Sequence, residues 1–149
     1  MAQLKSLGRE VSFTVEGKAY TLSRFGLPLL QELTDYAISQ MENPFDELSK
    51  IIDKLNPELQ QKAYEDARLE KQRQKSLNYK SPEVQAFFNS EKGAVKALQL
   101  LLRKHHPTIS ETEAFDLFFL AEQEHGEGYM ERLILQTQGE VASTGDFRK

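Results

Sequence analysis

Apolar and polar residues alternate near the start of the chain and then change to a helical period. Residues 11–15, VSFTV, place every second side chain on one apolar face, which is typical of a half-buried strand. Gly17 can adopt the positive φ of a tight turn, and residues 19–22 follow as a second strand. The pattern predicts a β-hairpin over residues 11–22, whose apolar face needs a covering layer because an isolated hairpin is marginal in water.

From residue 26 the apolar residues recur every three or four positions, which is the spacing of an amphipathic helix. The dipeptide Asn-Pro occurs at residues 43–44 and again at 56–57, and each copy puts a capping side chain directly before a proline. These signals predict one helix from residue 26, a second near 44–55 and a third over 57–78. The third is so polar that we expect it to project from the fold or to lie on its outside.

The most apolar helical segment follows, over residues 94–102, after a short helix that starts at Pro82. It is hydrophobic around much of its circumference, so we expect it at the centre of the core. Pro107 ends it, and Ser110 with Glu113 matches a capping box that begins an acidic, Phe-rich helix. A last helix extends to residue 139.

Together these elements predict a mainly α fold of the α+β class, a helical bundle of about five to six helices with a small N-terminal β-hairpin. Residues 1–139 are expected to form a single domain and residues 140–149 a flexible tail. The 149 residues include no cysteine, no long apolar run and no signal-like start, so neither membrane insertion nor secretion is expected. A reducing cytoplasm fits this composition.

Catalytic and metal-binding patterns are weak. His105 and His106 are adjacent, and side chains of adjacent helical residues point about 100° apart, so the two would not face one ion. They fit better as cationic complements to the end of a helix. Glu122 and His125 have the Glu-x-x-His spacing of di-metal bundles, but the second copy is missing. Since a nucleophile elbow and a phosphate-binding glycine loop are also missing, we predict no enzyme, no cofactor, and no catalytic or metal-binding residue.

Charge is unevenly distributed along a chain whose net charge is -4. Residues 68–80 are basic, whereas residues 110–131 hold many carboxylates and neither Lys nor Arg. Solvated helix faces explain such runs most simply. Two further interpretations stay open, namely docking between copies in a homo-oligomer and binding of nucleic acid by residues 68–80, although the acidic chain disfavours nucleic acid.

Two segments of the chain, FTVEGKAYTLSRFGLPLLQEL and ALQLLLRKHHPTISETEAFDLF, resemble the tail assembly chaperones of long-tailed bacteriophages. In that family a Gly-Lys-x-Tyr-x-Leu hairpin precedes the first helix, and a leucine-rich helix that ends near a proline precedes a Ser/Thr-Glu helix start. The matching residues here are Gly17, Lys18, Tyr20 and Leu22, then Leu100 to Leu102, Pro107, Ile109, Ser110 and Glu113. Residues 57–80 have no counterpart in the family pattern.

The resemblance implies a non-enzymatic protein that binds and solubilises the tape measure protein and helps to recruit tail tube subunits. It implies action in the host cytoplasm and absence from the mature virion. Another phage structural or adaptor protein, or a nucleic-acid-associated accessory protein, is the alternative. Apolar side chains that could line a groove for the partner, if they are not simply core residues, are Phe87, Phe88, Leu101, Phe115, Phe118, Phe119 and Leu135.

Overall fold

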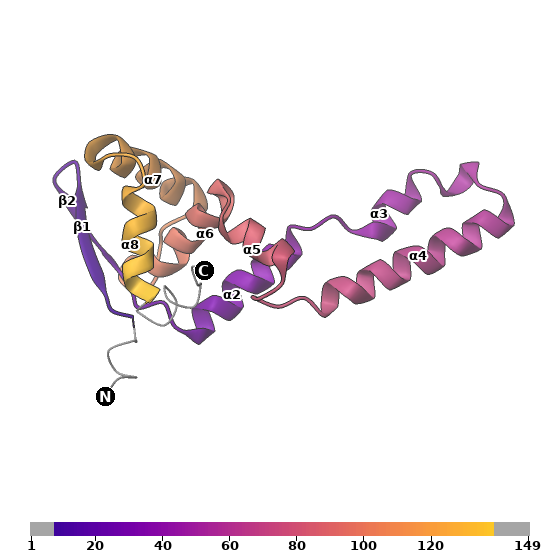
Figure 1. Ribbon diagram of the computed structural model, residues 1–149. Coiled ribbons are helices and arrows are strands. Elements are labelled where there is room, and N and C mark those ends of the chain that lie inside the picture. The colour runs from indigo at the N-terminus through magenta and orange to yellow at the C-terminus, as the bar shows by residue number, and fades with distance from the viewer. Residues whose placement is uncertain (1–7, 139–149) are drawn as a thin grey trace, which may run out of the picture.

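The computed structural model describes residues 8–138 and begins with the expected β-hairpin (Figure 1). Strands β1 (Val11–Val15) and β2 (Lys18–Leu22) pair antiparallel, with Val11 opposite Leu22. Glu16 and Gly17 form the turn with φ of 52° and 79°, the left-handed conformation of a tight hairpin turn. Alternate residues of β1 are buried, so the period of two in the sequence marks the face that packs on the helices.

Outside the hairpin the described chain forms helices joined by loops, and the predicted mainly α fold with an N-terminal hairpin is confirmed. The helices are α2 (Leu27–Ser39), α3 (Pro44–Ser49), the 3₁₀ turn η1 (Ile52–Lys54), α4 (Pro57–Lys75), α5 (Pro82–Phe88), α6 (Glu91–Leu102), α7 (Glu111–His125) and α8 (Tyr129–Gln138). The helix expected near 44–55 is interrupted, since α3 ends at Ser49 and only η1 follows. The tail expected over 140–149 lies outside the described residues.

Helix α6 occupies the centre of the core, as its apolar circumference predicts. It contacts β2 and the helices α2, α5, α7 and α8. Leu98, Leu101 and Leu102 have no exposed surface. The hairpin covers the sides of α6, α7 and α8, so the layer that an isolated hairpin lacks is supplied by these three helices (Figure 1).

The corner between α6 and α7 ties the hairpin to the helices. The predicted capping box is confirmed, because the Ser110 hydroxyl accepts from the Glu113 backbone N–H and the Glu113 carboxylate accepts from that of Ser110. His105 lies 2.8 Å from the Glu10 carboxylate. His106 differs from the expectation, because its Nε2 accepts the Thr21 backbone N–H at 3.3 Å, which requires a ring nitrogen without a proton.

The His106 contact predicts a loss of stability in mild acid. Burial, assisted by the nearby His105 and Lys18, holds the pKa of His106 below its ordinary value. The unfolded chain therefore takes up this proton at a higher pH than the folded chain. The stabilisation is complete above the ordinary histidine pKa of about 6.5 and is lost as the pH falls through the lower pKa of the folded protein.

Urea titrations between about pH 7.5 and pH 5.5 measure this effect. We expect His106→Gln, which keeps an acceptor for the Thr21 amide but cannot titrate, to flatten the fall in stability over that range. A variant that follows the wild-type profile at every pH would show that another group carries the dependence.

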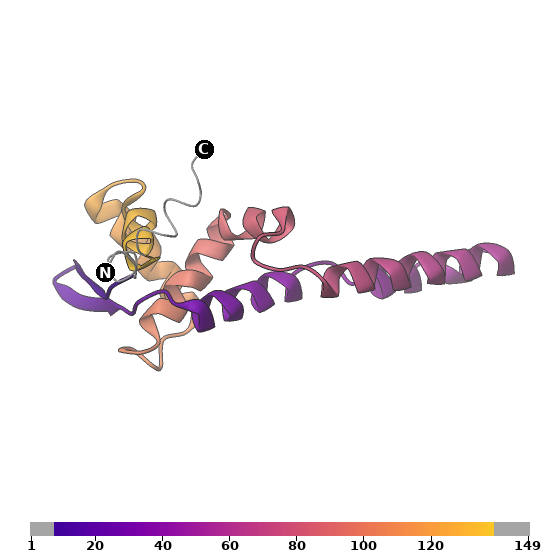
Figure 2. The same cartoon turned by 60° about the horizontal axis from the view of Figure 1, so that its bottom comes forward.

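A two-helix arm, residues 43–77, extends away from the core in both views (Figures 1 and 2). It consists of α3, η1 and α4, and α4 packs along α3. Its interior is thin, because Leu48 and Ala67 are the apolar residues of the arm that are buried, and neither belongs to the main core. The arm therefore leaves much apolar surface without cover from the rest of the described chain.

Candidate partner-binding groove

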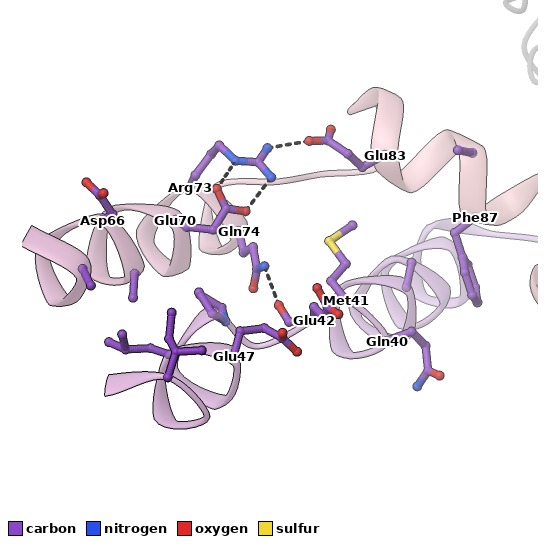
Figure 3. Close-up of a pocket in the computed structure, with 17 residues that line it drawn as sticks. Gln40, Met41, Glu42, Glu47, Asp66, Glu70, Arg73, Gln74, Glu83 and Phe87 are labelled. Carbon is purple, nitrogen blue, oxygen red and sulfur yellow. Dashed lines mark hydrogen bonds and ion pairs between the residues drawn. The ribbon is translucent and has the colours of Figure 1, made fainter. Parts of the chain in front are cut away.

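An open groove lies at the base of the arm, where α3 and α4 meet the core (Figure 3). Its volume is about 990 Å³, and its lining comes from the end of α2, from α3 and α4, and from α5. Ligand pockets of globular proteins have volumes up to about 1,000 Å³, and this groove is at the large, shallow end of that range. It is therefore suited to a segment of another chain better than to a small molecule.

The arm takes its shape from two copies of one local signal. Asn43 accepts the backbone N–H of Phe45 at 3.0 Å, and Asn56 accepts that of Leu59 at 2.9 Å, so each side chain caps the helix that its neighbouring proline begins. At the tip, the side-chain amide of Gln60 donates to the carbonyls of Ile52 and Leu55 at 3.0 and 2.9 Å. These bonds close the turn and hold α3 beside α4.

The floor of the groove is apolar and built largely from small residues. Ala63 and Ala67 lie four residues apart on the same face of α4, and Leu48 faces the groove from α3. The remaining apolar lining residues are Ala37, Met41, Pro44, Ile51, Ala86 and Phe87. Ala37, Leu48 and Ala67 are buried, so the apolar surface that stays open in the groove comes mainly from Met41, Ile51, Ala63 and Ala86.

The rim carries five carboxylates and one guanidinium (Figure 3). Arg73 on α4 bonds Glu70 through two nitrogens, at 3.0 and 2.8 Å, and also bonds Glu83 on α5. The hydrogen bonds from Arg73 lower the pKa of Glu70. The pKa of Glu83 is lowered first by its own backbone N–H at the start of α5 and then by Arg73. Arg73 is thus fully engaged, and it connects the arm to the core.

Other acidic side chains of the rim remain available. Glu42 and Asp66 form no ion pair within residues 8–138, and Glu47 has only an exposed contact with Lys50 at 3.4 Å. The base of the arm is fixed by Gln74, which is 7% exposed and donates from its side chain to the backbone carbonyl of Glu42 at 2.9 Å. The hydrogen bond from Gln74 therefore fixes the shape of the groove, and the rim of the groove carries an excess of negative charge.

Replacing Arg73 by Ala should loosen the arm from the core. Because the Arg73–Glu83 pair is 48% and 41% exposed, water screens it and global stability should change little. The backbone amides at the end of α4 and the start of α5 should nevertheless exchange several times faster, since local opening no longer breaks this bridge. Hydrogen–deuterium exchange measures the change. Arg68→Ala is the matched control, because Arg68 pairs with Glu65 within α4, and equal exchange in both variants would contradict the bridging role.

The structure does not bring the predicted partner-binding residues to one site. Phe87 lines the groove, where its ring packs against Tyr36 with centroids 5.8 Å apart. Phe88 and Phe118 are half-buried against the core. Leu101 is fully buried and presents no surface, so we withdraw it from the candidate contact residues.

Two of the predicted partner-binding residues, both on α7, are exposed. Phe115 and Phe119 are 46% and 56% exposed, because α7 packs through a stripe of Ala114, Leu117 and Ala121. Leu135 on α8 is 50% exposed. These side chains lie on the core and do not line the groove of the arm.

The basic segment 68–80 is partly neutralised by carboxylates. Arg68 pairs with Glu65, and Arg73 pairs with Glu70 and Glu83. Lys71, Lys75 and Lys80 remain without an ion pair among the described residues, so the segment offers less free charge to a nucleic acid than its composition suggests.

Sequence reasoning missed the groove because its lining comes from segments that are separately unremarkable. Ala63 and Ala67 lie in the segment 57–78, whose pattern is predominantly polar, and Met41 follows the helix that begins near residue 26. The useful signal was the repeat of Asn-Pro at 43–44 and 56–57, which marks two successive helix starts joined by a short connection and is typical of a helical hairpin.

No protein-family model, no curated protein and no solved structure matches this chain. Within the described residues, no three His, Asp or Glu side chains are grouped so that they could hold a metal ion. The helices of residues 8–138 include none that is both long and apolar enough to cross a membrane.

Proposed function

We propose that this protein is a tail assembly chaperone of a long-tailed bacteriophage, a non-enzymatic protein that binds the tape measure protein and keeps it soluble. In this role it helps to recruit tail tube subunits in the host cytoplasm and does not remain in the mature virion. The observation that carries the proposal is the apolar groove at the base of the projecting arm. The sequence resemblance supplies the identity of the partner.

The arm has the surface that a protein-binding chaperone needs. Five of its large hydrophobic side chains are more than a third exposed, namely Phe45, Ile51, Leu59, Tyr64 and Leu69. Burial of apolar surface contributes roughly 25 cal/mol per Å², so covering these side chains with an apolar partner is favourable for both molecules. A protein that binds the exposed helices of an aggregation-prone chain lowers the concentration of free partner and so suppresses aggregation.

Co-expression with the tape measure protein tests the proposal. We expect the tape measure protein to be soluble and to co-purify with this chain, and to be insoluble when it is expressed alone. If the tape measure protein stays insoluble with the chaperone present and no complex is isolated, the proposed function is wrong. The charge-docked homo-oligomer would instead be detected by light scattering of the protein alone at low and high salt.

A further inference from the structure

We propose that the groove at the base of the arm binds an amphipathic helix whose apolar stripe is flanked by Lys or Arg side chains. The inference deepens the proposed function, because it states the chemistry of the partner segment that the same groove would hold. Its test uses designed peptides, so it gives a result whether or not the tape measure protein is the natural partner.

The shape of the groove favours a helix as its occupant. The lining follows α4 from Ala63 to Gln74, which corresponds to about 16 Å, or three helical turns. Along this length Ala67 is buried, and the apolar surface that stays open comes from Met41, Ile51 and Ala63. Ile51 is 48% exposed in this strip. Apolar residues of an incoming helix, spaced by three and four, would cover this strip.

The charged side chains on the rim of the groove favour a basic helix as the occupant. Five carboxylates, those of Glu42, Glu47, Asp66, Glu70 and Glu83, surround the floor, and Arg73 is the single cation among the lining residues. Because Arg73 is already bonded to Glu70 and Glu83, it does not offset the carboxylates of Glu42 and Asp66. An acidic helix would meet like charges at the rim, whereas Lys or Arg beside the apolar stripe would form ion pairs there. Figure 3 shows the carboxylates of Glu42 and Glu47 near Met41, beside the apolar lining.

A second copy of the chain is a poorer fit to the groove. Lys71 and Lys75, which form no ion pair among residues 8–138, lie on one face of α4, and the large apolar side chain on that face is Tyr64 alone. A helix with this face would satisfy the acidic rim and leave the apolar floor uncovered. Lys62 lies beside the exposed Leu59 and Leu69 on another face of α4, but Glu65 and Asp66 share that face and would meet like charges at the rim. The occupant that matches both rim and floor is therefore a basic helix with an apolar stripe, supplied by another protein.

Fluorescence anisotropy with the full-length protein and three labelled peptides tests the proposal. The peptides are about 14 residues long, enough for three turns, and carry a leucine stripe flanked by Lys, the same stripe flanked by Glu, or the Lys composition with scrambled leucines. We expect the Lys-flanked stripe to bind at least about tenfold more tightly than either other peptide at about 50 mM salt, and this preference to shrink at about 500 mM.

Two pairs of variants locate the binding. Glu42→Lys with Asp66→Lys should abolish the preference for the Lys-flanked peptide, whereas the control Asp116→Lys with Glu131→Lys changes the net charge equally on exposed positions of α7 and α8 and should preserve it. Ile51→Gln should weaken binding about tenfold, and Leu69→Gln, which alters a side chain of similar exposure on the same arm outside the groove, should not.

Three outcomes would overturn the inference. The first is equal binding of the Lys-flanked and Glu-flanked peptides, and the second is equal loss in groove and control variants, which would indicate non-specific attraction. The third is a change in self-association by Ile51→Gln without any change in peptide binding, because this would identify a second copy as the occupant. Success with the peptides and failure of the tape measure co-expression would reject the proposed function and leave the groove assignment standing.

Discussion

Leu101→Ala is expected to reduce the free energy of unfolding by about 3 kcal/mol, which lowers the melting temperature by about 10 °C. Leu101 has no exposed surface and lies on α6, the helix that contacts β2, α2, α5, α7 and α8. Removal of its side chain leaves a cavity in the middle of the core, and surrounding elements on every side limit the collapse that could fill it. Such a loss is a large fraction of the stability of a typical domain.

Leu135→Ala provides the comparison, since Leu135 is 50% exposed on α8. Its effect on stability should stay within about 0.5 kcal/mol. Both residues were predicted contacts for a partner, so the pair separates a core role from a surface role for the same change of side chain. Urea titration measures both variants. A Leu101→Ala protein as stable as the wild type would mean that α6 does not occupy the centre of the core.

The sequence predicted those features that depend on residues close together along the chain. Asn43, Asn56 and Ser110 cap the helices that they precede, and each cap is completed by a backbone N–H two or three residues away. The hairpin likewise depends on an alternation over five residues and a turn at Gly17. Hydrogen bonds between residues so close along the chain are determined by the local sequence. They can therefore be predicted without knowledge of the fold.

Features that join distant segments could not be predicted in the same way. The Nε2 of His106 accepts from the backbone of Thr21, 85 residues earlier, and the Gln74 side chain donates to Glu42, 32 residues earlier. Neither partner is visible in a helical or strand period. The rim of the groove depends on such pairings too, because Arg73 and Glu83 come from different helices.

The exposed aromatic side chains of α7 show how packing decides between equally apolar residues. Phe115 and Phe119 are larger than Ala114 and Ala121, yet the alanines face the core. Small residues let α7 approach α6 closely, and the side chains that flank this stripe are then directed toward solvent. Periodicity identifies an apolar helix, but the choice of its buried face depends on the shape of the neighbour.

Gly93→Ala is expected to destabilise the protein by about 2–3 kcal/mol, although the same change in an ordinary helix interior stabilises by about 0.5–1 kcal/mol. Gly93 lies in the first turn of α6, where a Cβ atom would be 2.0 Å from the carbonyl oxygen of Phe87 at the end of α5. The obstruction is backbone, so no side-chain rotation relieves it. Ser90 tightens the corner further, because its hydroxyl donates to that carbonyl at 2.6 Å and accepts the Gly93 N–H at 3.0 Å.

The Gly93→Ala substitution should also alter the shape of the groove. Phe87 lines the groove and would have to move with the end of α5. We therefore expect faster hydrogen exchange in α5 together with the lower unfolding free energy, which urea titration measures. Gly26→Ala is the control, because the nearest atom to its added Cβ would be Pro28 Cδ at an ordinary 3.7 Å, and its effect should stay within about 1 kcal/mol. If Gly93→Ala proved more stable than the wild type, α5 and α6 could not meet at the close distance that the structure gives them.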